Sequence, residues 1–203
     1  MTVVPAPVPV SPVRGRLVFC GLTGCSDSSG QMAPWGGSWR AIETYMRGDA
    51  FAPVAAAVHE QRPEYSTQEI QDIFAGFHDV DFTELHVEGA DVSFEADGTV
   101  LCEGRYESHA ADHDGDDADH DHGVGVHLEL LRTRQGDCEP DFEHVDFASL
   151  PIEQLLDDGE LLAHFHLTAG VERAQPWSPG VIEPIEDALF TAMQMENVDV
   201  YAA

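Results

Sequence analysis

An alternation of apolar and polar residues runs through the middle of the chain and predicts a series of short β-strands. The dipeptide Asp97-Gly98 lies between two such segments and is a strong signal for a tight hairpin turn. Antiparallel strands connected in this way, and in this number, favour a closed or nearly closed β-barrel. The pattern begins at Val80 and Phe82 and continues through residues 90–94, 99–102, 124–130, 142–147 and 163–168.

Helical periodicity lies on both sides of this region, so we predict a mainly β fold with N-terminal helices and a C-terminal helix. Trp39, Ile42 and Met46 recur at helical spacing before Gly48, a residue type that favours the left-handed turn after a helix. Pro53 suits the first turn of a second helix, and Ser66 with Glu69 forms a capping box before a third. The apolar faces expected in the core are Val54 and Val58; Ile70, Ile73, Phe74 and Phe77; and Ile185, Leu189 and Met193.

The charge of the chain excludes one class of partner. Its 203 residues include 38 Asp and Glu against nine Arg, a net charge of −29. A polyanion would be repelled by such a surface, so nucleic acid is not an expected partner. The length suits a single domain with a real core, and no stretch reaches the roughly 20 apolar residues of a membrane-spanning helix.

The N-terminal segment predicts export. Leu22-Thr23-Gly24-Cys25 resembles a bacterial lipobox, in which the cysteine thiol receives a lipid, and Arg14 and Arg16 precede a short apolar stretch. We therefore expect residues 1–31 to be a signal and linker segment, lipid-anchored at Cys25, and residues 32–203 to be the folded domain. The alternative is a disordered tail that contains this tetrapeptide by chance.

Two histidines on one predicted strand form the candidate metal site. Side chains alternate between the two faces of a strand, so His164 and His166 would share one face while Phe165 packs on the other. Imidazoles about 6.5 Å apart at the backbone can converge on one ion, because Zn–N bonds measure about 2.0–2.1 Å. The alternative is a pair of solvated surface histidines.

A second candidate is the His- and Asp-rich tract at residues 108–123, which is too polar to bury a core and is expected to form a loop. Imidazole and carboxylate ligands suit zinc and related divalent ions, so the tract is an auxiliary metal-binding candidate. The alternative is a solvated acidic hairpin. The histidines of this loop are His109, His113, His120 and His122.

Several landmarks follow one another in the order seen in a known family. They are Trp35-Gly36-Gly37-Ser38-Trp39, Gly48 with Phe51-Ala52-Pro53-Val54, Glu69-Ile70 with Gly76-Phe77 and Asp79-Val80, Cys102 with Tyr106, Cys138, and Ala163-His164-Phe165-His166 with Gly170. Together they resemble the ZinT (YodA) family, which also occurs as the C-terminal domain of AdcA-type zinc-binding lipoproteins. The resemblance covers the chain from about Trp35 to Gln194.

This resemblance implies a lipocalin-like (calycin) β-barrel with a metal site at its mouth and a disulfide between Cys102 and Cys138. It also implies binding of zinc, with cadmium or other divalent ions as further ligands, and supply of zinc to an ABC uptake system or its solute-binding protein. His164 and His166 correspond to two of the family's three histidine ligands, but Leu150 stands at the position of the third. Candidate replacements are His144, Glu153, Asp157 and Asp158.

The leading prediction is an exported zinc-binding protein, periplasmic or on the cell surface, that captures metal and catalyses no reaction. The sequence contains neither an HExxH motif nor a Gly-x-Ser-x-Gly elbow, so a zinc hydrolase is not favoured. The alternative function is a lipocalin-like carrier that holds a small organic ligand in the barrel and has no metal role.

Overall fold

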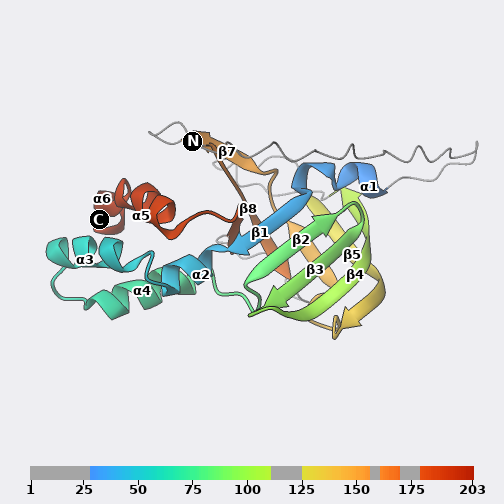
Figure 1. Cartoon of the computed structure of the whole chain (residues 1–203), viewed down its shortest axis with the longest axis horizontal. Coiled ribbons are helices and arrows are strands. Elements are labelled where there is room, and N and C mark those ends of the chain that lie inside the picture. The colour runs from blue at the N-terminus through green and yellow to red at the C-terminus, as the bar shows by residue number, and fades with distance from the viewer. Residues whose placement is uncertain (1–27, 111–124, 156–160, 170–178) are drawn as a thin grey trace, which may run out of the picture.

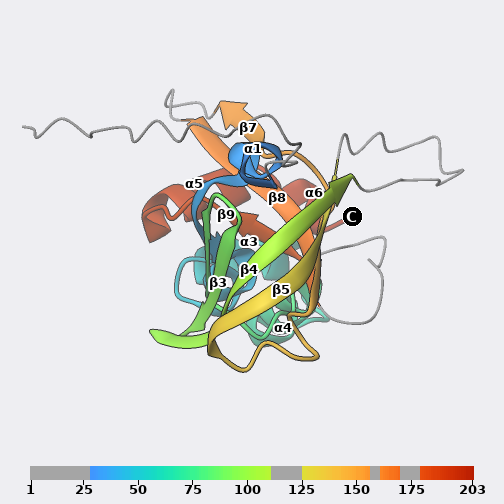
Figure 2. The same cartoon turned by 90° about the vertical axis from the view of Figure 1, so that its right-hand side faces the viewer.

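The computed structural model describes residues 28–110, 125–155, 161–169 and 179–203. Its centre is a closed antiparallel barrel, as predicted, and the barrel has eight strands (Figures 1 and 2). The sheet order is β6-β5-β4-β3-β2-β1-β9-β8, and pairing between β6 and β8 closes the ring, while β7 adds to β8 outside it. The strands are β1 (Gly37–Ala41), β2 (Glu84–Glu88), β3 (Asp91–Ala96), β4 (Thr99–Ala110), β5 (Val126–Gly136), β6 (His144–Phe147), β7 (Ile152–Leu155), β8 (Leu161–Ala169) and β9 (Gly180–Ile182).

The hairpin between β3 and β4 forms where Asp97-Gly98 predicts it. Both residues have positive φ, 51° and 75°, as a turn that matches the twist of the two strands requires. The start of the strand region differs from the prediction, because Val80 and Phe82 precede β2 and belong to no strand. Phe82 is instead buried as a core residue, with its ring 5.2 Å from that of Phe94.

Aromatic side chains fill the interior of the barrel. The ring of Phe147 lies 5.7 Å from that of Trp35 and 5.0 Å from that of Phe165, and Trp39 approaches Phe165 at 4.8 Å. All four are buried, as are the aliphatic residues that alternate along the same strands. At one end of the barrel a disulfide joins Cys102 to Cys138, the pair that the family resemblance implies.

Helices α2 to α6 form a lobe on one side of the barrel with a core of its own (Figure 1). Tyr45 stacks on Phe190 at 4.6 Å, and Phe51 packs against Phe74 at 5.7 Å. Near the other end of the barrel, Gln31, the last residue of α1 (Ser28–Gln31), accepts a hydrogen bond from Ser108 of β4. The helices are α1 (Ser28–Gln31), the 3-10 helix η1 (Ala33–Trp35), α2 (Ile42–Arg47), α3 (Ala52–Gln61), α4 (Thr67–Gly76), α5 (Asp187–Met195) and α6 (Val198–Tyr201).

The helix predictions hold in part. The capping box of Ser66 and Glu69 is present, and Pro53 lies in the first turn of α3. Trp39, however, lies in β1, and α2 begins only at Ile42. Gly48 follows α2 in an extended conformation with φ −85°, because the chain continues directly into the next turn instead of reversing.

The apolar stripe of α4 is only partly in the core. Ile70 is 2% exposed, whereas Ile73 and Phe77 are 45% and 51% exposed, because α4 lies at the edge of the lobe and turns only one side inward. Within the described ranges, no helix is long and apolar enough to cross a membrane.

Candidate metal centre

His164 and His166 lie on the outer side of β8, and the residues between and beside them face inward. Phe165 and Leu167 are fully buried in the barrel core, and the two imidazoles are half-buried on the opposite face. Their ring centroids are 6.1 Å apart. Two imidazoles on one tetrahedral zinc ion have centroids roughly 5 Å apart, given Zn–N bonds of about 2.0–2.1 Å. A small side-chain adjustment would therefore bring both rings onto one ion.

A third imidazole, that of His78, lies beside this pair. It follows α4, and its Nδ1 accepts a hydrogen bond of 3.2 Å from the backbone N–H of Gly180, the residue paired with His166 across β8 and β9. A Cβ atom on Gly180 would lie 2.6 Å from Ile42 Cδ1, so a larger residue there would have to displace the Ile42 side chain, whereas its 3.5 Å distance from His78 Nδ1 is an ordinary contact. Three histidines thus gather where the helical lobe meets the barrel.

Burial keeps two of these imidazoles neutral. Desolvation, and secondarily the charge of His166, lowers the pKa of His78 from its usual 6.5 to about 4. The same two causes, in the same order, lower the pKa of His164. Neutral imidazole is the form that binds metal, so the lowered pKa values favour the coordinating form of His78 and His164.

The lowered pKa of His78 predicts acid-sensitive stability. Between pH 6.5 and 4 an imidazole of the unfolded chain takes up a proton that folded His78 excludes, so the free energy of unfolding falls as the pH falls. At about 1.4 kcal/mol per pKa unit, the loss from His78 is on the order of 3 kcal/mol. Urea unfolding of the metal-free protein across this range measures it. His78→Asn keeps an acceptor for Gly180 and should flatten the pH dependence; a profile identical to that of the wild type would contradict this assignment.

The segment between β6 and β7 forms a bulge beside the part of β8 that carries the histidine pair. Ala148 donates its N–H to the carbonyl of His166 at 2.8 Å, and Ile152 is paired with His164, so the three residues between them lie opposite Phe165 alone. The bulge is held by Trp35, whose indole N–H donates to the carbonyl of Ser149 at 2.8 Å. Leu150, at the predicted position of the third histidine, lies in this bulge and is 39% exposed.

Two of the predicted replacement ligands do not join the pair. Glu153 is paired with Ala163, which places it on the face of the sheet opposite to that of His164. His144 shares the outer face, but the register puts it four residues beyond the position opposite His166, roughly 13 Å along the strand. Asp157 and Asp158 are outside the described residues.

His144 belongs instead to a row of histidines across three strands. Its ring stacks on that of His127 at 5.5 Å, and His127 lies 6.4 Å from His109. Asp146 lies 2.7 Å from His127 Nδ1. The predicted loop at 108–123 therefore begins later than expected, because Ser108, His109 and Ala110 are paired residues of β4. His113, His120, His122 and the predicted lipidation site Cys25 are outside the described residues.

Comparison with known proteins identifies the fold. No protein-family model matches the chain, and neither does any curated protein sequence. Among solved structures, the chain is similar to the zinc-bound ZinT-like domain of Streptococcus pneumoniae AdcA, with a TM-score of 0.49 and 13% identity over 81% of this chain and 89% of that one. It is also similar to zinc-bound AdcA of the same organism, with a TM-score of 0.51 and 12% identity over 85% of this chain. The fold is ZinT-like. This chain matches only 39% of the length of that AdcA chain.

Neither the sequence nor its likeness to the ZinT family predicted that His78 lies beside His164 and His166. His78 lies in a segment that resembles the family, but it carries no motif and is 102 residues away from its partner Gly180. Only the packing of the helical lobe against β8 and β9 brings it to the other two histidines.

Proposed function

We propose that this chain is an extracytoplasmic zinc-binding protein that captures zinc between His164 and His166. The observation that carries the proposal is the pair itself: two imidazoles 6.1 Å apart on one face, beside a third. Zinc sites usually have three or four protein ligands, so we propose His78 as the third. Its Nδ1 would have to release the N–H of Gly180, a cost that lowers the affinity of the site.

Several features support capture and transfer of metal over catalysis. The similar solved structures are of zinc-bound proteins. A half-buried site with few ligands can also release its ion, as handing zinc to an ABC uptake system or its solute-binding protein requires. The Cys102–Cys138 disulfide fits an oxidising, extracytoplasmic location. Anchoring through Cys25, recruitment of ions by His113, His120 and His122, and binding of cadmium belong to the same proposal.

The alternative carrier function is less well supported by the interior of the barrel. A lipocalin-like carrier needs a cavity there for its ligand. In this chain Trp35, Trp39, Phe147 and Phe165 form a continuous series of ring contacts across the core. An organic ligand would have to displace these buried rings.

Native mass spectrometry separates the two functions. The metal-free protein mixed with one equivalent of zinc should gain the mass of one ion, and the complex should persist at pH 6 because the pKa values of His78 and His164 are lowered. Protein purified from its host without added metal provides the comparison. An organic adduct that zinc does not displace, with no zinc bound at neutral pH, would favour the carrier.

A further inference from the structure

A second group of metal-ligand side chains lies on the outer wall of the barrel, away from His164 and His166. Glu84, His86 and Glu95 each offer one ligand atom, and these atoms all lie within 4.8 Å of one another. Within the described part of the chain, no other set of three such residues is this close, the histidines at β8 included. We propose that this group is a second site for a divalent first-row metal ion.

The register explains why these side chains meet. Glu84 and His86 are two residues apart on β2 and face outward, while Leu85 between them is fully buried. Glu95 of β3 is directly opposite Glu84. Like charges in such a pair repel each other, so the two carboxylates favour a cation between them.

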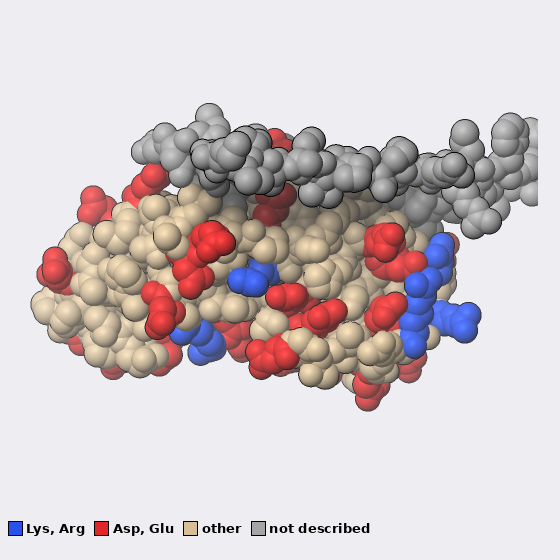
Figure 3. Space-filling view, in the orientation of Figure 1, with Lys and Arg blue, Asp and Glu red and all other residues tan. Residues whose placement is uncertain are grey.

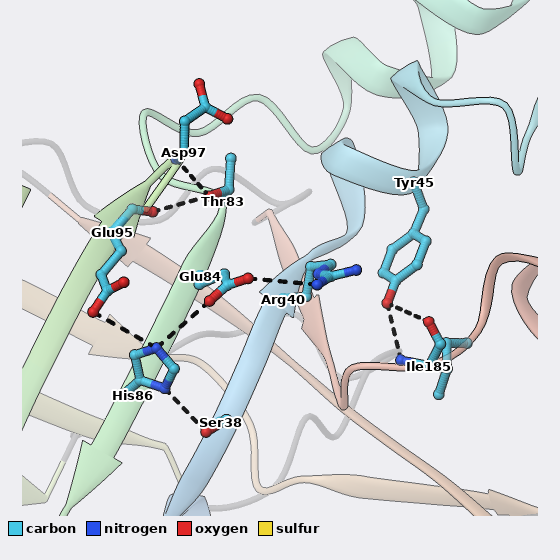
Figure 4. A network of polar contacts seen from close by, with 9 residues as sticks. All are labelled: Ser38, Arg40, Tyr45, Thr83, Glu84, His86, Glu95, Asp97 and Ile185. Carbon is cyan, nitrogen blue, oxygen red and sulfur yellow. Dashed lines mark hydrogen bonds and ion pairs between the residues drawn. The ribbon is translucent and has the colours of Figure 1, made fainter. Parts of the chain in front are cut away.

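The orientation of His86 suits coordination (Figure 4). Its Nδ1 lies 3.0 Å from the hydroxyl of Ser38 on the adjacent strand, which leaves Nε2 directed at the carboxylates. A hydrogen bond of this kind on the other ring nitrogen is the usual companion of a metal-binding histidine.

The distances from His86 Nε2 to the two carboxylates are closer to the spacing of ligand atoms around one metal ion than to the length of a hydrogen bond. Nε2 lies 3.7 Å from Glu84 Oε2 and 3.9 Å from Glu95 Oε1, too far for hydrogen bonds, which measure about 2.7–3.2 Å. Ligand atoms at about 2.1 Å from a tetrahedral ion are roughly 3.4 Å apart. Arg40 pairs with the other oxygen of Glu84 at 3.4 Å and leaves Oε2 directed at His86.

The surrounding charge and the ligand types indicate the kind of ion. One imidazole and two carboxylates suit Zn²⁺, Fe²⁺ or Mn²⁺. All three side chains are half-buried, so the site is open to ions from solvent. Acidic side chains are scattered over the described face of the molecule on which β2 and β3 lie (Figures 1 and 3). This group is separate from the histidine pair on β8. Glu84 is paired with Arg40, Arg40 with Ile182, and Ile182 with His164, so three strand-to-strand steps, or roughly 14 Å, lie between Glu84 and His164.

The test uses the full chain with His164→Ala and His166→Ala, so that its outcome does not depend on the proposed function. Zinc is titrated into ¹⁵N-labelled protein while the imidazole signals of His86 are followed by NMR. We expect these signals to shift with saturation, and Glu84→Gln with Glu95→Gln to weaken binding at His86 at least about tenfold. Glu88→Gln, which removes an exposed carboxylate from the same strand and face, is the matched control and should change nothing.

Two results would overturn the second site. One is a set of His86 signals that stays unmoved up to millimolar zinc. The other is an equal shift in the protein that lacks both carboxylates, because His86 would then bind zinc without them. Unchanged circular dichroism of each variant verifies the fold, and the isosteric Glu→Gln changes keep the volume of the surface side chains.

Discussion

Replacing His164 by alanine is expected to weaken zinc binding at least about a hundredfold. The site has few ligands, and loss of even an outer partner of a metal ligand typically costs 10–100-fold, so loss of a ligand itself should reach or exceed the upper value. Isothermal titration of the metal-free protein at pH 7 measures the change. The fold should survive, because the imidazole is half-buried on the outer face and the core contacts of β8 come from its neighbours Ala163 and Phe165.

His144→Ala is the matched control for this experiment. It removes an imidazole from the same outer face, but from a position roughly 13 Å along the sheet from His166. Its zinc affinity at the principal site should equal that of the wild type. Equal losses in the two variants would mean that zinc is held diffusely by surface histidines, and an unchanged affinity in His164→Ala would remove β8 from the site.

The predictable part of the fold is the part encoded by local pattern. Asp97-Gly98 defines one hairpin, Ser66 with Glu69 defines one helix start, and alternation around Phe165 defines the two faces of β8. β9 has only three residues, too few for a pattern to show. Val80 and Phe82 alternate like strand residues, yet pairing starts only at Glu84, so alternation alone did not locate the first residue of the strand.

The candidate sites also differ in how much of their geometry follows from local sequence pattern. His164 and His166 lie on one strand, and their spacing alone predicts that they share a face. His78 reaches them through the packing of separate lobes, which no local pattern encodes. The outer group lies between these cases, because a two-residue turn at Gly89-Ala90 pairs Glu88 with Asp91 and so sets Glu84 opposite Glu95. The alternation of β2 already predicts that Glu84 and His86 share a face, but the position of Glu95 follows only from the register of the hairpin.

Placing a histidine at position 150, in Leu150→His, should raise the affinity for zinc about tenfold or more. Leu150 lies in the bulge opposite Phe165, next to the backbone positions of His164 and His166, and a third imidazole there would complete a three-histidine site without displacing His78 from Gly180. Because the side chain is 39% exposed, the substitution should leave stability nearly unchanged. Competition with a zinc chelator measures the gain.

Leu150→Ala separates the added ligand from the lost side chain. It removes the same leucine without supplying a donor, so its affinity should match that of the wild type. Leu150→His combined with His164→Ala should lose most of the gain, because the new imidazole acts only together with the pair on β8. If Leu150→His alone brings no increase, the bulge does not place this position over the histidines, and the correspondence with the family's third ligand is wrong.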